Sequence, residues 1–186
     1  EFADRKSSEF YISEDEKKLI EDVSGIFRSK GKKTVVILNI GGVIETASWK
    51  DLPDAILCVW QAGQEGGNSV ADVLSGNATP SGKLPMTFPV DMYDHGSALN
   101  FPVDSDMPLS FTPDKSGRTD RKDIDYVIYE EGIYVGYRWF DKKGLKVSYP
   151  FGHGLSYTEF EYSDAQIESG KNETEIAVTI KNTGSY

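Results

Sequence analysis

The chain has 186 residues, enough for one complete domain or parts of two, and its 38% hydrophobic and 12% aromatic content is typical of a globular protein. The formal net charge of −10 argues against nucleic acid or an anionic membrane as partner, because both require clustered Lys and Arg. No run approaches the roughly 20 apolar residues of a membrane span. Cys58 is the only cysteine, so no internal disulfide forms, and its apolar surroundings (AILCVW) predict a buried, unreactive thiol.

The first regular element expected is an amphipathic helix within residues 12–31 (ISEDEKKLIEDVSGIFRSKG). Ser13 and Glu16 have the spacing of an N-cap and capping box, and Gly31 is suited to the left-handed position after the last turn. Apolar residues recur at helical spacing in between, at Leu19, Ile20, Val23, Ile26 and Phe27. The spacing therefore predicts a helix with one apolar face.

Two short apolar runs follow this helix. TVVILN, residues 34–39, and Ala55 to Trp60 are typical of strands that are buried on both faces of a layered sheet. A glycine-rich loop, QAGQEGGNSV, then leads into a short helix near residues 69–74 that Gly76 ends. This order of elements predicts a layered α/β domain over residues 1–90.

Residues 91–155 are predicted to connect this domain to the next. PSGKLPMTFPVDMY leaves the α/β domain as an extended segment, and residues 91–125 are polar and rich in turn residues. Aromatic residues return at 126–140, and Tyr134, Tyr137, Trp139 and Phe140 predict either a packed seam between domains or a surface on which sugars stack. The seam is the more common arrangement.

The last segment, residues 156–186, is predicted to begin a β-sandwich. IAVTI alternates as a half-buried strand does, and Gly, Asn and Ser bound it. About two strands fit into this segment, which is too few for an independently stable sheet.

The residue pattern alone leaves two kinds of site open. Glycines at 41–42 and 63–67 could form an anion or nucleotide site at strand ends, although GxGxxG and P-loop spacings are absent and Glu65 would repel an anion. A metal site is not expected, because His95 and His153 are the only histidines and neither has a partner at ligand spacing. His153 in PFGHG is expected to support a tight turn. No cofactor is expected.

Four segments together resemble glycoside hydrolase family 3, the β-glucosidase and β-xylosidase family. They are VVILNIGGVIETASW, DLPDAILCVWQAGQEGGNSVADVLSGNATPSGKLPMTFP, YEEGIYVGYRWFD and YPFGHGLSYTEFEY, in the family's order. The resemblance implies the later part of an enzyme built from a barrel, an α/β sandwich and a fibronectin type III-like β-sandwich. The chain would then hold part of the α/β sandwich, with a mostly parallel sheet, and the truncated start of the third domain. The barrel would be a missing partner from the same enzyme.

The resemblance also assigns a catalytic residue. The family's acid/base is a Glu in a stretch resembling S-G-E-G-x-D-R, a short link and F-Y-L-S. Here EFADRKSSEFYIS places Glu1 at that Glu, Asp4 and Arg5 at the Asp-Arg pair, and Phe10 to Ser13 at F-Y-L-S. Phe2 and Ala3 depart from the pattern, and Glu-Phe is also encoded by a common restriction site. A frayed end or a residue left by cloning are therefore the alternatives at Glu1.

The implied activity is that of a retaining β-glycosidase, most simply a β-glucosidase acting on a β-linked glucoside or oligosaccharide. Such enzymes use two carboxylates about 5 Å apart, and the family's nucleophile is an Asp of the barrel. We therefore expect the chain alone to be inactive. A nucleotide- or anion-binding module and a non-catalytic docking module are the rival functions. Family analogy favours a periplasmic or secreted location, which the residues themselves leave open.

Overall fold

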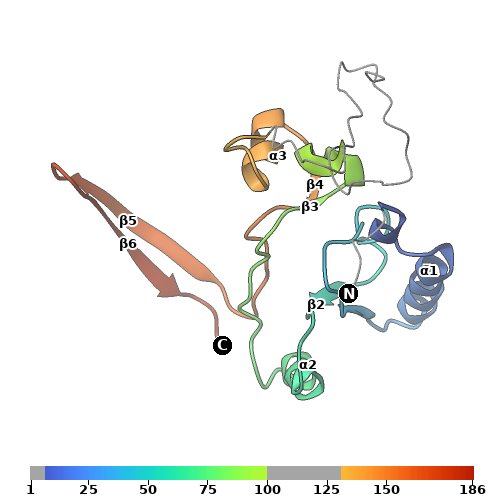
Figure 1. The fold of residues 1–186 in the computed structure, drawn as a ribbon. Coiled ribbons are helices and arrows are strands. Elements are labelled where there is room, and N and C mark those ends of the chain that lie inside the picture. The colour runs from blue at the N-terminus through green and yellow to red at the C-terminus, as the bar shows by residue number, and fades with distance from the viewer. Residues whose placement is uncertain (1–6, 100–130) are drawn as a thin grey trace, which may run out of the picture. The chain divides into compact units, whose positions relative to one another are not determined.

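The computed structural model describes residues 7–99 and 131–186. The chain forms two compact units, each built from two stretches of sequence (Figure 1). The first unit comprises Glu1–Ala62 and Leu84–His153, and the second comprises Gly63–Lys83 and Gly154–Tyr186. The division into domains at residues 90 and 155 stays a prediction.

Helix α1 (Glu14–Ser29) follows the short 3₁₀ turn η1 (Ser7–Phe10) and confirms the predicted capping box. The Ser13 side chain accepts a hydrogen bond from the Glu16 amide, and the Glu16 carboxylate accepts one from the Ser13 amide at 2.8 Å. Two amides that have no partner inside the helix are thereby satisfied. Gly31 has φ +65°, as the predicted left-handed position requires.

Strands β1 (Val35–Leu38) and β2 (Ala55–Cys58) pair in parallel, which supports the predicted α/β layering. Leu38, Ile44 and Trp49 form the buried core of this region, against which residues of α1, β1 and β2 pack. The prediction that the first of these strands, β1, is buried on both faces is wrong. The side chains of Val35 and Ile37 are 42% and 43% exposed, because packing against α1 and the 40–52 loop covers only the opposite face.

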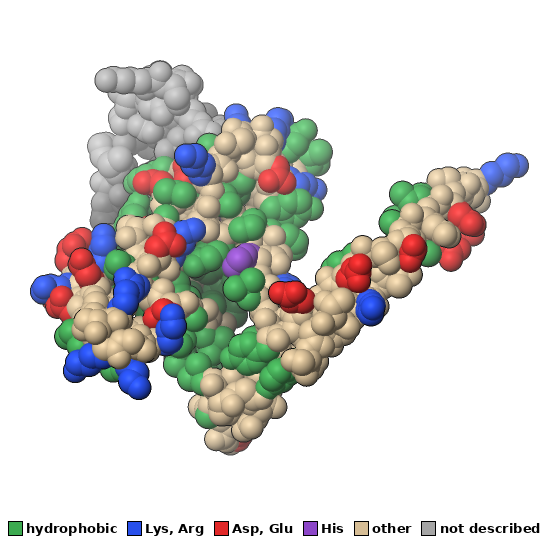
Figure 2. All heavy atoms as spheres, turned by 180° about the vertical axis from the view of Figure 1, so that it is seen from behind, with side chains coloured by type: hydrophobic (Ala, Val, Ile, Leu, Met, Phe, Trp, Pro, Cys, Tyr) green, Lys and Arg blue, Asp and Glu red, His purple; other side chains and the backbone are tan. Residues whose placement is uncertain are grey.

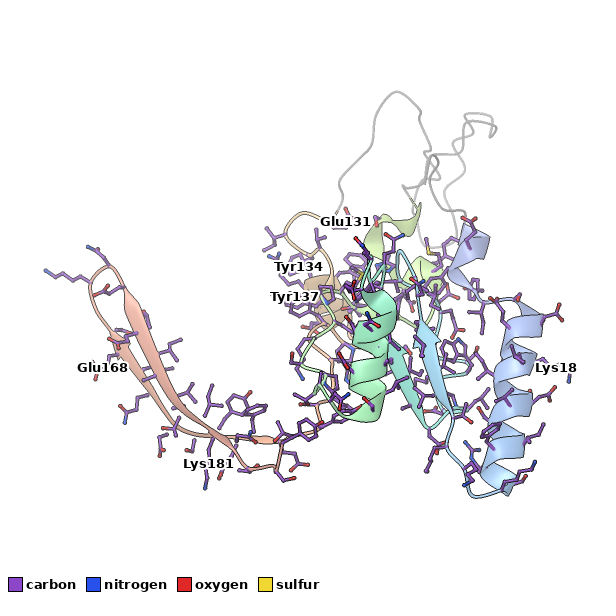
Figure 3. All side chains as sticks on the ribbon, turned by 90° about the horizontal axis from the view of Figure 1, so that it is seen from below. Lys18, Glu131, Tyr134, Tyr137, Glu168 and Lys181 are labelled. Atoms are coloured by element: carbon purple, nitrogen blue, oxygen red, sulfur yellow. The ribbon has the colours of Figure 1, made fainter. Side chains whose placement is uncertain are left out.

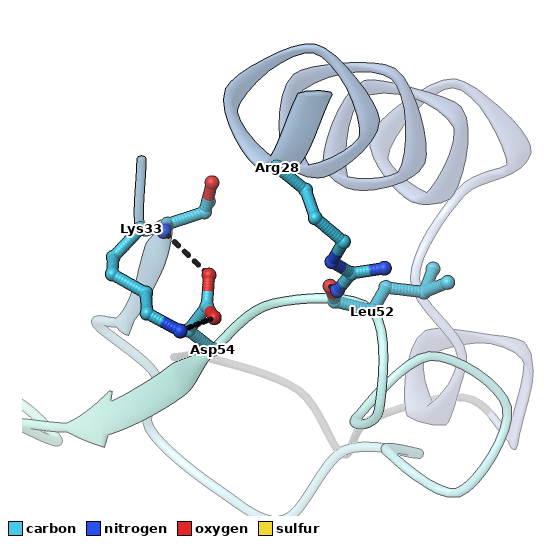
Figure 4. A network of polar contacts seen from close by, with 5 residues as sticks. Arg28, Lys33, Leu52 and Asp54 are labelled. Carbon is cyan, nitrogen blue, oxygen red and sulfur yellow. Dashed lines mark hydrogen bonds and ion pairs between the residues drawn. The ribbon is translucent and has the colours of Figure 1, made fainter. Parts of the chain in front are cut away.

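Polar contacts hold the ends of these elements together (Figure 4). The Asp54 carboxylate, just before β2, accepts hydrogen bonds from the Lys33 ammonium at 2.8 Å and from the Thr34 amide at 2.9 Å. Both contacts lower the pKa of Asp54, the Lys33 hydrogen bond most. Arg28 donates to the Leu52 carbonyl at 2.6 Å, so the end of α1 is joined to the same connection.

The remainder of the first unit consists of short elements. Strand β3 (Phe88–Pro89) pairs in antiparallel with β4 (Val147–Tyr149), and two 3₁₀ turns, η2 (Met92–Asp94) and η3 (Gly96–Leu99), follow β3. Helix α3 (Tyr137–Lys143) precedes β4 and buries Phe140. The predicted connection at 91–125 thus begins as two turns, and the rest of it lies outside the described residues.

The second unit contains helix α2 (Gly66–Ser75) and a hairpin of β5 (Phe160–Ser169) and β6 (Thr174–Asn182), drawn in orange to red in Figure 1. Gly76 ends α2 in the left-handed conformation, φ +79°, as predicted. The Tyr157 hydroxyl donates to the Val73 carbonyl at 2.9 Å, and the Thr79 and Ser156 hydroxyls lie 3.1 Å apart. These contacts fasten α2 to the segment that leads into β5.

The hairpin has one apolar and one polar face. The register pairs Tyr162 with Ile180 and Ile167 with Ile176, which places on one face Phe160, Tyr162, Ile167, Ile176, Val178 and Ile180. Glu168 and Lys181, labelled in Figure 3, belong to the other face, and Figure 2 shows charged side chains spread along the hairpin. A one-sided hairpin is what the start of a β-sandwich requires. The fibronectin type III-like identity stays a prediction.

A β-bulge keeps the apolar face continuous. Three steps along β5, from Ser163 to Gln166, match only two steps along β6, from Thr179 to Ala177. Without the extra residue, Ile167 would turn to the polar face. Asp164 occupies the bulge with φ +54°. None of the helices in the described ranges is both long and apolar enough to cross a membrane.

Candidate active site

Glu1, the residue predicted to be catalytic, lies outside the described residues, as do Phe2, Ala3, Asp4 and Arg5. The described chain begins at Ser7, in the 3₁₀ turn η1. The described part of the candidate site is the group of contacts that holds the chain at Phe10 and Tyr11, just after the predicted catalytic segment.

Phe10 is the first anchor of this segment. Its side chain is 3% exposed, and its carbonyl accepts a hydrogen bond from the Glu45 amide at 2.7 Å. The Phe10 and Tyr11 rings pack edge to face with centroids 5.0 Å apart. Because Glu45 lies in the loop that follows β1, the backbone of η1 is fixed to the loop at the carboxyl end of that strand.

Glu45 is a buried carboxylate that sequence reasoning missed. Its side chain accepts hydrogen bonds from the Ser48 amide at 2.6 Å and the Ser48 hydroxyl at 2.9 Å, and its carbonyl accepts one from the Trp49 indole at 2.8 Å. Both carboxylate oxygens are thus paired, which explains how a charged group is tolerated at 6% exposure. The sequence E-T-A-S, residues 45–48, could have indicated this contact, since an acidic side chain can accept a hydrogen bond from the backbone amide three residues later.

Tyr11 is the second anchor. Its hydroxyl donates a hydrogen bond to Asp91 Oδ2 at 3.2 Å, across 80 residues of sequence. Burial raises the pKa of Tyr11, and the negative charge of Asp91 adds to the shift. The other oxygen of Asp91 accepts a hydrogen bond from the Tyr93 amide at 2.8 Å. One carboxylate therefore caps η2 and holds the residue that follows η1.

The turns η2 and η3 are in turn held by α3. The Trp139 indole donates to the Asp94 carbonyl at 2.9 Å, and the His95 and Phe140 rings pack edge to face at 5.3 Å. A Cβ at Gly96 would lie 2.8 Å from Glu131 Cγ and 3.2 Å from the Trp139 ring, so this approach requires glycine. Burial lowers the pKa of His95, which keeps its imidazole neutral at pH 7.

The aromatic segment after residue 131 carries cations on its ring faces. Lys142 Nζ lies 3.4 Å from the centre of the Tyr134 ring, and Lys143 Nζ lies 4.9 Å from that of Trp139. Tyr137 stacks on Phe151 at 4.9 Å, and both side chains are about half exposed. Figure 3 labels Tyr134 and Tyr137. These contacts fit a seam or a sugar-stacking surface equally, so both readings stay predictions.

The remaining candidates have local structural roles. Glu65 is the N-cap residue of α2; its side chain makes no cap hydrogen bond but accepts one from the Asn68 side-chain amide at 2.6 Å, so a negative charge lies near the N-terminus of the helix. His153 donates its backbone amide to the Pro150 carbonyl at 3.1 Å, in the tight turn predicted for PFGHG. Cys58 is partly buried, and burial raises the pKa of its thiol. Within the two described ranges, no three His, Cys, Asp or Glu residues are grouped to hold a metal.

Comparison with known proteins finds relatives that are glycosidases. The Glycosyl hydrolase family 3 C-terminal domain matches residues 1–137. Thermostable beta-glucosidase B of Acetivibrio thermocellus is 37% identical over 177 residues, which are 93% of this chain and 20% of that protein. An exo-alpha-(1->6)-L-arabinopyranosidase of Bifidobacterium longum is 36% identical over 166 residues, 89% of this chain and 19% of that protein.

A solved structure agrees in fold. Beta-glucosidase 3B of Thermotoga neapolitana, in complex with alpha-D-glucose, superposes with a TM-score of 0.82 at 48% identity, covering 98% of this chain and 24% of that one. The chain thus spans about a fifth of the length of the curated relatives it matches. With most of its length matched by the family's domain and by this structure, the chain belongs to glycoside hydrolase family 3.

Proposed function

We propose that this chain supplies the general acid/base of a retaining β-glycosidase, with Glu1 as the acid/base and a β-linked glucoside as substrate. The observation that carries the proposal is the register of EFADRKSSEFYIS: Glu1 is followed by Asp4 and Arg5 at the family's spacing and then by the confirmed capping box of α1. Relatives named as β-glucosidases, one bound to glucose, support the substrate class.

In the proposed reaction, Glu1 acts twice. It first protonates the glycosidic oxygen while the nucleophilic Asp of the family's barrel attacks the anomeric carbon, forming a covalent glycosyl-enzyme. It then removes a proton from the water that releases the sugar. The first step requires a protonated carboxyl group, which a neighbouring carboxylate favours until that neighbour is glycosylated.

The test uses the full-length enzyme that carries this sequence. Glu1→Ala is compared with wild type on aryl β-glucosides with good and poor leaving groups, with and without azide. We expect the variant to lose most activity on the poor leaving group, on the order of 100-fold or more, and far less on the good one, because only the poor one needs a proton. Azide, which needs no general base, should yield a β-glycosyl azide.

Glu14→Ala is the matched control, since Glu14 is an exposed carboxylate in the first turn of α1. It should leave the dependence on the leaving group unchanged. Wild-type behaviour of Glu1→Ala would show that the acid lies elsewhere and that this chain is scaffold, which is the docking-module alternative. No observation on the described residues favours the nucleotide-binding alternative, and the negative charge of Glu65 at the start of α2 disfavours an anion there.

A further inference from the structure

The chain is fixed at two adjacent residues just after the segment that carries Glu1. The carbonyl of Phe10 is held by the Glu45 amide, and the hydroxyl of Tyr11 by the Asp91 carboxylate. The first contact joins the chain to the loop after β1, and the second joins it to η2. Because these two contacts reach different parts of the first unit, they fix both the position and the direction of the chain at residues 10 and 11, which a single contact cannot do.

The acceptor of the Tyr11 hydrogen bond is itself held in place. The Asp91 amide donates to the Asp94 carboxylate at 3.0 Å, and the Asp91 carboxylate accepts from the Tyr93 amide. The Asp94 carbonyl receives the indole N–H of Trp139, on helix α3. The Tyr11 hydroxyl therefore binds a carboxylate that the 3₁₀ turn η2 and helix α3 hold in place.

We propose that Tyr11 is a positioning residue for Glu1. Its hydrogen bond to Asp91 fixes the point at which the segment carrying the acid/base joins the folded body. This inference rests on the proposed function. The two oxygen atoms of this contact lie 3.2 Å apart, and the Tyr11 side chain is 44% exposed. Catalysis is sensitive to such placement, since a misplacement of about 1 Å can lower a rate about 100-fold.

The test measures kcat/KM of the full-length enzyme on aryl β-glucosides whose leaving groups range from good to poor. Tyr11→Phe removes the donor, and Asp91→Ala removes the acceptor. A misplaced acid slows substrates with poor leaving groups most. We therefore expect kcat/KM of each variant to fall about 5- to 20-fold on the substrate with the poorest leaving group and less than about 2-fold on the one with the best. A purely structural role would lower kcat/KM by the same factor for every substrate, because only the fraction of folded enzyme would change.

Tyr93→Phe is the matched control, because Tyr93 lies in the same turn and contacts Asp91 through its backbone amide. It should keep the wild-type dependence on the leaving group. A wild-type dependence in Tyr11→Phe or in Asp91→Ala overturns the inference, since the hydrogen bond needs both groups. Glu1→Ala, measured in the same series, separates the two proposals. If Glu1→Ala changes the dependence on the leaving group as expected and Tyr11→Phe does not, only the positioning role fails. If Glu1→Ala leaves that dependence unchanged, the proposed function fails.

Discussion

Ser13 and Glu16 bind each other's backbone amides at the start of α1, and each side chain depends on the other. The hydroxyl of Ser13 also donates to the Glu16 carboxylate at 2.7 Å. These hydrogen bonds lower the pKa of Glu16 from its ordinary value of 4.5, the one from the Ser13 hydroxyl most. Since α1 begins three residues after Tyr11, the cap also defines how the chain leaves the anchored segment.

Replacing Ser13 with Ala should weaken the first turn of α1. The loss of an N-cap side chain costs about 1 kcal/mol, which corresponds to roughly fivefold faster hydrogen exchange of the first-turn amides in the full-length enzyme. Ser29→Ala, at the other end of the helix, is the control and should leave those amides unchanged. Equal exchange in Ser13→Ala and wild type would show that the capping box does not stabilise the helix.

The Ser13–Glu16 pair also predicts that the stability of the first turn of α1 depends on pH. The folded-state pKa of Glu16 lies below its unfolded value of 4.5, so its stabilising contribution is complete above that pH and disappears as the pH falls through the folded-state pKa. Protection of the first-turn amides, corrected for intrinsic exchange, should therefore decrease below about pH 4.5 in the wild type. Ser13→Ala should show a smaller decrease, because Glu16 then loses its main hydrogen-bond donor. A decrease of the same size in both proteins would contradict the assignment.

At the scale of elements, the bulge in β5 determines which side chains share a face with β6. Asp164 takes the left-handed conformation there, and the Ser163 hydroxyl donates to its carboxylate at 2.9 Å. Among residues with a side chain, Asp and Asn accept this conformation best, while β-branched residues are poorly suited to it. The identity of residue 164 is therefore tied to the continuity of the apolar face.

Asp164→Ile should destabilise the hairpin by about 1 to 2 kcal/mol, whereas Asp164→Gly should be neutral or slightly stabilising. The measurement is hydrogen exchange at β5 and β6 in the full-length enzyme. Glu168→Ile is the matched control: Glu168 stands opposite Glu175 on the polar face, in extended backbone that suits a β-branched residue. If Asp164→Ile and Glu168→Ile were equally stable, the left-handed conformation would not constrain residue 164.

Elements specified by neighbouring residues could be predicted, and contacts between distant residues could not. The limits of α1 follow from Ser13, Glu16 and Gly31, which act within one turn of the residues they cap. The Tyr11–Asp91 hydrogen bond joins residues 80 apart and depends on how η1 and η2 pack, which no local pattern encodes. The exposed face of β1 was mispredicted because an apolar run shows that burial is favourable, but not which layer covers it.

At the scale of the whole molecule, the proposed reaction needs more than this chain. The two carboxylates of a retaining glycosidase lie about 5 Å apart, and the family's nucleophile belongs to the barrel. The chain matches only about a fifth of its curated relatives. In the proposed function the chain supplies one half of this catalytic pair, and the anchors at Phe10 and Tyr11 belong to the first unit.

The purified 186-residue chain should accordingly release no p-nitrophenol from an aryl β-glucoside above the uncatalysed rate, whereas we expect the full-length enzyme to release it. Without a nucleophile, no glycosyl-enzyme forms, and acid catalysis also needs a carboxyl group with a raised pKa beside a bound substrate. The matched control is the chain with Glu1→Gln, which should give the same background. Steady release by the wild-type chain that disappears in Glu1→Gln would show that Glu1 acts without the barrel, and the two-carboxylate mechanism would have to be abandoned for this protein.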